Sequence, residues 1–209
     1  MLDHVGRPAE GADFAGACVR PATRRLPGVD GIWVLIGVDS VVFVLLFVSF
    51  MQARMADPQL FDDARVTLNR NLGGINTVIL LTSSWAVALS VQALRDGSPV
   101  RAKRFLAGAL VAGGAFVGFK LFEYVDKIGH GITPVTNDFY MWYFALTGIH
   151  LVHVLIGLGL LGYVFVGIRR GTYDRARLVV PECVASFWHL VDFLWVVLFP
   201  LVYLMEVAR

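Results

Sequence analysis

FWHLVDFLWVVLFPLVY, residues 187–203, decides the fold class of this chain. The stretch has the length and apolar character of a helix that crosses a membrane, yet it contains His189 and Asp192. Ionisable side chains are costly inside hydrocarbon, so they persist there only with partners or with a function. A spacing of three residues places the imidazole and the carboxylate on one face of the helix. We expect this face to turn towards other helices.

The composition of the whole chain agrees with a membrane environment. Of the 209 residues, 57% are hydrophobic and 16% charged, and the mean hydropathy is +0.68, whereas a soluble domain carries about a quarter charged residues. Apolar runs of about 20 residues can cross a bilayer, and five occur, at 31–51, 74–94, 105–125, 139–166 and 184–207. We therefore predict an all-α membrane protein with five transmembrane helices over 31–207.

The distribution of charge predicts the orientation. Residues 1–30 mix charged residues with three prolines and contain no apolar segment typical of a signal peptide, so they are interpreted as a cytoplasmic tail. This tail and the 95–104 and 167–183 loops hold twelve Lys and Arg residues, against five in the opposite loops and C-terminus. The bias places the N-terminus inside and the C-terminus outside. Cys18 and Cys183 form no metal-type spacing, and a disulfide between them is not expected on the cytoplasmic side.

Counting residues along the helices predicts a shared layer of buried polar groups. Asp39 and Asp192 each lie about 12 Å from the cytoplasmic edge, and His189 is slightly shallower. On the same count His150 and His153 lie about 14 and 9 Å from that edge. The five side chains could form a structural hydrogen-bonded cluster, or a site that binds or buffers protons. A third interpretation, haem ligation, needs His150 or His153 together with His189.

The third helix carries a second ionisable pair, Lys120 and Glu123. Their spacing of three residues favours an ion pair, and a position near the outer surface would let Lys120 reach the interface. We expect a solvated interfacial pair or, as the alternative, a contact with lipid head groups or a partner. The sequence contains no phosphate-binding loop, nucleophile elbow or c-type haem motif. No catalytic residue, cofactor or metal site is therefore predicted.

Five motifs together resemble the subunit III family of haem-copper respiratory oxidases over residues 31–203. The resemblance lies in GIWVLIGVDSVVF (31–43), NTVILLTSS (76–84), FKLFEY (119–124), LTGIHLVHVLIG (146–157) and WHLVDFLW (188–195). Their order on successive helices matches that of the family, which makes the set specific although each motif alone is weak.

The resemblance implies an accessory, non-catalytic subunit without haem or metal, bound to the catalytic subunit of a respiratory complex in a bacterial inner membrane. It implies the five-helix form of the family, with a V-shaped cleft that holds phospholipids. The roles it suggests are to stabilise the catalytic subunit, to sustain its proton uptake and to shape lipid or oxygen access. It also predicts a contact between Asp39 and His153.

One departure from the family pattern bears on the partner. Most oxidase members have Glu where this chain has Asp39, and this variant resembles the branch associated with nitric oxide reductase. The alternative partner is therefore the catalytic subunit of nitric oxide reductase. A different class of function, a membrane anchor that binds haem b or a quinone, would use His150, His153 and His189.

Overall fold

The computed structural model describes residues 30–173 and 178–205, and this part of the chain is helical without strands. Five of its helices are long and apolar enough to cross a membrane. They are α1 (Asp30–Ala56), α3 (Arg70–Arg95), α4 (Pro99–Gly129), α5 (Asp138–Arg169) and α6 (Val179–Phe199). The prediction of an all-α, multi-pass membrane protein with five spans is confirmed. The proposed cytoplasmic tail and Cys18 lie outside the described residues.

The helices extend beyond the predicted apolar runs because their ends are stabilised by polar residues. The Asn69 side chain accepts a hydrogen bond of 3.1 Å from the Leu72 backbone, and Asn137 accepts one of 2.9 Å from the Tyr140 backbone. Such caps satisfy backbone N–H groups that the first helical turn leaves free. Just after the C-terminal end of α4, Gly131 adopts a φ of 77°, a backbone conformation that favours glycine. This residue ends the helix.

A short helix that the hydropathy pattern did not predict, α2 (Pro58–Val66), joins α1 to α3. Asp57 caps it, and proline occupies its first turn. Buried Arg54 contacts it by an ion pair of 2.9 Å with Asp62, and donates a second bond of 2.7 Å to the Met205 carbonyl. Arg54 thereby ties the end of α1 to α2 and to Met205, six residues beyond the end of α6.

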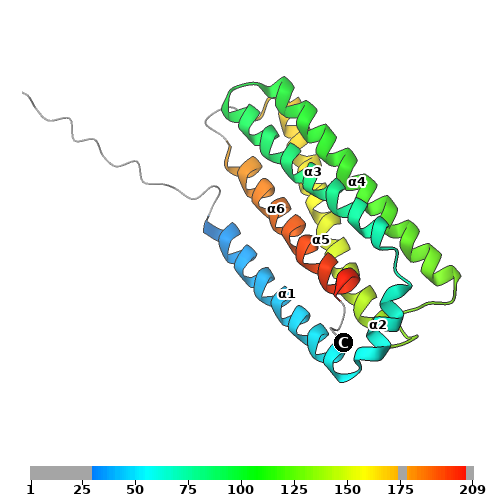
Figure 1. Cartoon of the computed structure of the whole chain (residues 1–209). Helices are drawn as coiled ribbons and strands as arrows, with labels where there is room; N and C mark the ends of the chain where they lie inside the picture. The colour runs from blue at the N-terminus through cyan, green and yellow to red at the C-terminus, as the bar shows by residue number, and fades with distance from the viewer. Residues whose placement is uncertain (1–29, 174–177, 206–209) are drawn as a thin grey trace, which may run out of the picture.

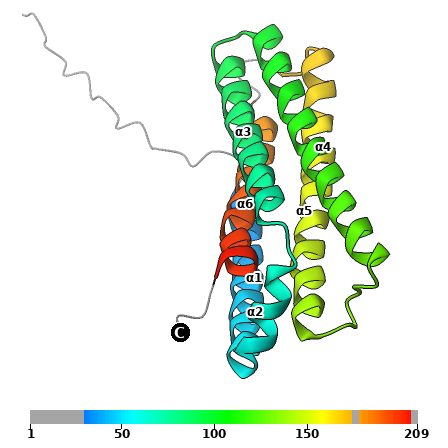
Figure 2. The ribbon, with the colours of Figure 1, turned by 45° about the vertical axis from the view of Figure 1, so that its right-hand side comes forward.

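Helix α6 forms the centre of the bundle. It contacts α1, α3 and α5, and Figure 1 shows it between α1 and the α3–α4 hairpin. In the most apolar window of each span, 56% of the residues are buried for α6 but only 11% for α1. In the rotated view of Figure 2, α5 runs beside α4. The start of α1, the α3–α4 turn and the start of α6 share one end of the bundle (Figure 1), as the charge pattern requires, although the side of the membrane stays a prediction.

Two glycines make room for Trp188, one of the two tryptophans of α6. A Cβ at Gly157 would lie 2.6 Å from the Trp188 ring, and one at Gly113 would lie 2.7 Å from Leu158 and 3.0 Å from Trp188. Trp188 itself is fully buried. The indole therefore packs against bare backbone of α4 and α5, which lets the three helices approach closely. The V-shaped lipid cleft implied by the resemblance stays a prediction.

Candidate functional site

The contact predicted between α1 and α5 is present. His153 Nε2 lies 3.0 Å from Asp39 Oδ1, and His153 Nδ1 lies 2.8 Å from the Ile149 carbonyl oxygen. A carbonyl only accepts, so Nδ1 carries a proton. The Nε2–Oδ1 contact then needs one further proton, held either by the imidazole or by the carboxyl group. The pair is electrically neutral in both arrangements, which suits a half-buried position inside a membrane.

The other predicted members of the polar layer lie elsewhere in the bundle. His189 of α6 shares a hydrogen bond of 2.5 Å between its Nδ1 and the Ser84 hydroxyl of α3. Asp192 is 3% exposed, and neither of its oxygens makes a hydrogen bond of good geometry to a described residue. His150 is fully buried between aromatic rings, with centroids 5.9 Å from Phe116 and 5.2 Å from Trp195.

The structure therefore does not bring the five side chains of the predicted layer into contact with one another. Of the five side chains, the structure joins Asp39 and His153, while His189 bonds to α3 and His150 lies against rings. The reason is that depth along a helix fixes a level in the bundle but not the direction in which a side chain points.

The hydrogen bonds of His153 leave it no ring nitrogen for a cofactor, whereas both nitrogens of His150 lack a hydrogen-bond partner within the described residues. Both ring nitrogens of His153 are engaged by Ile149 and Asp39, and Nδ1 of His189 is engaged by Ser84. Within residues 30–173 and 178–205, no three His, Cys, Asp or Glu side chains gather as metal ligands. The interpretation as a haem or quinone anchor gains no support from these contacts.

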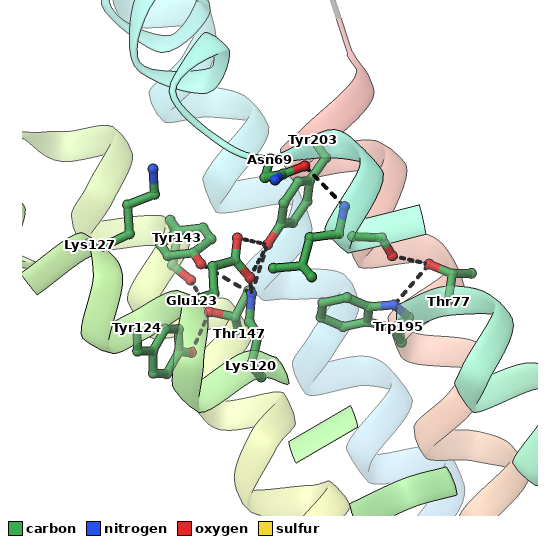
Figure 3. A network of polar contacts seen from close by, with 12 residues as sticks. Asn69, Thr77, Lys120, Glu123, Tyr124, Lys127, Tyr143, Thr147, Trp195 and Tyr203 are labelled. Carbon is green, nitrogen blue, oxygen red and sulfur yellow. Dashed lines mark hydrogen bonds and ion pairs between the residues drawn. The ribbon is translucent and has the colours of Figure 1, made fainter. Parts of the chain in front are cut away.

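The expectation for Lys120 and Glu123 is half confirmed and half wrong. They form the expected ion pair, with Lys120 Nζ 2.9 Å from Glu123 Oε2, but their side chains are only 1% and 4% exposed. Lys120 also donates hydrogen bonds of 2.7 Å to the Tyr203 hydroxyl and 3.1 Å to the Tyr143 hydroxyl, and Tyr203 donates one of 2.8 Å to Glu123 (Figure 3). The pair is not solvated at an interface, and its burial leaves almost no side-chain surface for lipid or a partner.

Lys120 fails to reach the surface because α5 and α6 cover it. It lies nine residues, about 14 Å, from the end of α4. Aromatic rings surround its ammonium group at 4.8 to 5.4 Å; those of Tyr143 and Trp195 come from α5 and α6, and that of Tyr203 from the segment that follows α6. Such rings attract a cation with their faces. Together with the three hydrogen-bond partners they replace the water that a buried ammonium loses.

Tyr143 and Tyr203 are the members of this network that the sequence interpretation missed. Tyrosines near the ends of apolar helices usually belong to the interfacial aromatic belt, so neither stood out. Tyr203 is carried by a π-helical segment, η1 (Pro200–Leu204), which continues α6. Pro200 supplies no backbone N–H, and π-helical turns are frequent at functional sites. The proline was the one available sign of an altered helix end.

Comparison with known proteins assigns the family. Residues 28–207 match the family described as cytochrome c oxidase subunit III. The chain belongs to this family. Subunit III relatives align along most of their length: the cytochrome c oxidase subunit 3 of a Synechocystis species is 30% identical over 84% of this chain and 74% of the relative. The quinol oxidase subunit 3 of Bacillus spizizenii is 31% identical over 88% and 89%.

The more distant cytochrome bo(3) ubiquinol oxidase subunit 3 of Pseudomonas putida is 25% identical over 86% of both chains. These relatives are named as oxidase subunits and lend no support to the nitric oxide reductase branch that Asp39 suggested. The resemblance drawn from five motifs is confirmed at the level of the family.

Each of the subunit III motifs contributes to the buried polar contacts. The first supplies Asp39, the second Ser84, the third Lys120 with Glu123, and the fourth His153. The fifth supplies His189 and the Trp195 indole, which donates a bond of 3.1 Å to Thr77 and faces Lys120. The motifs therefore mark the places where the five spans are joined by polar side chains.

Proposed function

We propose that this chain is an accessory, non-catalytic subunit of a haem-copper oxidase in a bacterial inner membrane. The observation that carries the proposal is the family match over residues 28–207, with relatives that are subunits of cytochrome c and quinol oxidases. In this role the chain binds the catalytic subunit and supports its stability, its proton uptake and the access of lipid and gas.

The internal contacts support an accessory role. Asp39 pairs with His153, and Lys120 pairs with Glu123, within the bundle. The first pair joins α1 to α5, and Lys120 of the second pair also donates hydrogen bonds to Tyr143 of α5 and Tyr203 of η1, so these contacts hold the helices together. The polar groups thus serve to build a defined surface, while electron transfer belongs to the partner.

The most exposed span supports an intermolecular or lipid contact. Helix α1 has the most apolar window of the five spans, and only 11% of that window is buried within the chain. Its outward residues include Val34, Val38 and Leu45, each at least 60% exposed. We propose that the catalytic subunit and phospholipids cover this helix, with the N-terminus of the chain inside and the C-terminus outside.

Deletion and complementation test this function. In membranes from a strain that lacks the chain, the oxidase should lose its oxygen-consuming activity faster during turnover, and re-expression of the chain should restore its lifetime. Oxygen consumption and the amount of assembled oxidase that both remain equal to wild type would contradict the proposal.

A further inference from the structure

An open polar groove leads from one end of the bundle into the space between α3 and α6. It has a volume of about 520 Å³, and its polar lining includes Gln92, Ser186 and His189. At its outer end, Arg95 and Glu182 form an ion pair of 2.7 Å. His189 follows Glu182 by seven residues, which places it about 10 Å further along α6. The groove therefore carries polar groups well below the ends of the spans.

The polar path continues inward from His189. Its Nδ1 lies 2.5 Å from the Ser84 hydroxyl, and Asp192 follows His189 by three residues, which places it one turn further along the same face of α6 and within reach of that hydroxyl. Asp192 is 3% exposed and has no cationic partner within the described residues. A carboxylate buried in this way is costly, and binding a proton removes the cost.

We propose that Asp192 is a proton-binding site that exchanges protons with the α3–α6 groove through Ser84 and His189. The starting state has Nδ1–H of His189 donating to the Ser84 oxygen and Ser84 O–H pointing to ionised Asp192. A hydronium in the groove gives its proton to Nε2 of His189. The Nδ1 proton passes to the Ser84 oxygen while the hydroxyl proton of Ser84 passes to Asp192. The groove loses one proton, Asp192 gains one, and His189 ends neutral with its proton on Nε2.

Most of the other ionisable groups near α6 are paired with residues other than Asp192. On α1 and α5, Asp39 and His153 neutralise each other, and on α4 Lys120 is neutralised by Glu123. His150 of α5 lies against Trp195 and has no hydrogen-bond partner within residues 30–173 and 178–205. Between its terminal arginines, α3 contains no ionisable side chain. Ser84 and His189 are thus the groups that can pass a proton between the groove and Asp192.

This proton site goes beyond the proposed accessory role and does not depend on which complex the chain joins. The structural alternative is that Asp192 is a permanently neutral packing group. The two differ in whether the carboxyl proton exchanges with bulk water and in which residues control the rate of that exchange.

Infrared spectroscopy of the full chain in lipid nanodiscs tests the proposal. We expect a carbonyl stretching band of a protonated carboxyl group that shifts on transfer to D2O and disappears as the pH is raised. The band should be absent in Asp192→Asn and present in the control variant Asp39→Asn. A band that neither exchanges nor titrates would overturn the proposal, as would a band that persists in Asp192→Asn.

The rate of exchange tests the path and does not require the Asp192 variant to fold. Ser84→Ala and His189→Phe should each slow deuterium exchange of the band about tenfold or more, because each removes a group that relays the proton. Ser83→Ala is the matched control, since Ser83 donates to the Ala109 carbonyl on the α4 side and should leave the rate unchanged. Wild-type exchange rates in both Ser84→Ala and His189→Phe would overturn the proposed path.

Discussion

Asp39 and His153 form the contact that joins the peripheral helix α1 to α5 through polar groups. In Asp39→Leu, Nε2 of His153 loses its partner inside the bundle. We expect the free energy of unfolding to fall by about 1–3 kcal/mol, which is the usual cost of an unsatisfied buried group. Denaturation in detergent, combined with His153→Phe in a double-mutant cycle, measures the coupling energy.

Ser49→Ala is the control for this cycle. It removes a bond that α1 makes only to its own backbone, from the Ser49 hydroxyl to the Leu45 carbonyl. Its effect should be near zero. A coupling energy of zero between Asp39 and His153 would mean that their contact contributes nothing to the fold.

Lys120 and Glu123 behave differently when one or both are removed. Lys120→Met leaves a buried carboxylate without its cation, and breaking a buried pair in this way costs about 3–5 kcal/mol. The double variant Lys120→Met/Glu123→Leu should recover most of the loss, because no charge remains buried. Thermal unfolding of the variants measures both effects.

Lys103→Met serves as the reference, because Lys103 lies exposed on the same helix, and it should unfold like wild type. If Lys120→Met also unfolds like wild type, the aromatic and carboxylate shell around the ammonium group does not stabilise the protein.

The sequence could predict some of these residues and not others. The Asp39–His153 contact followed from two motifs of a known family. The shell around Lys120 did not, because the tyrosines come from α5 and from the end of α6, and only helix register in three dimensions brings their hydroxyl groups to one nitrogen. Residue counting likewise placed Asp192 and His153 in one layer of the membrane but could not tell which neighbour each would meet.

At the level of the helices, the close packing of Trp188 of α6 against Gly157 of α5 can be tested by substitution. Gly157→Ala adds a Cβ 2.6 Å from the indole, so the ring or the helices must shift. We expect a loss of about 1–3 kcal/mol in the free energy of unfolding, as for other overpacked cores. Gly159→Ala on the same helix meets nothing within 4 Å and should be neutral or slightly stabilising. Equal stability of the two variants would contradict the packing of α5 against α6.

The five spans could be predicted because hydrocarbon thickness sets the length of an apolar helix. Helix α2 could not, since nine residues with mixed polarity show neither a membrane run nor a clear period. Its position depends on Arg54, which bonds to Asp62 of α2 and also to the Met205 carbonyl, 151 residues further along the chain. Contacts of that separation leave no local mark in a sequence.

For the whole molecule, the orientation in the membrane follows from the loop charges and can be measured directly. Alkaline phosphatase fused after Met205 should be active, because the C-terminus is predicted to lie outside, where the enzyme folds. A fusion at Ser98 in the α3–α4 turn should be inactive. The reverse pattern would show that the bundle is inserted the other way and that the α3–α6 groove opens outside.

The proposed function depends on the binding of this subunit III protein to a haem-copper oxidase. Affinity purification of the tagged chain in mild detergent, with mass spectrometry and a haem spectrum of the eluate, tests it most directly. We expect a catalytic oxidase subunit to co-purify and haem to appear in proportion to that subunit. Recovery of the chain with a nitric oxide reductase instead, or with haem bound in the absence of any catalytic subunit, would contradict the account.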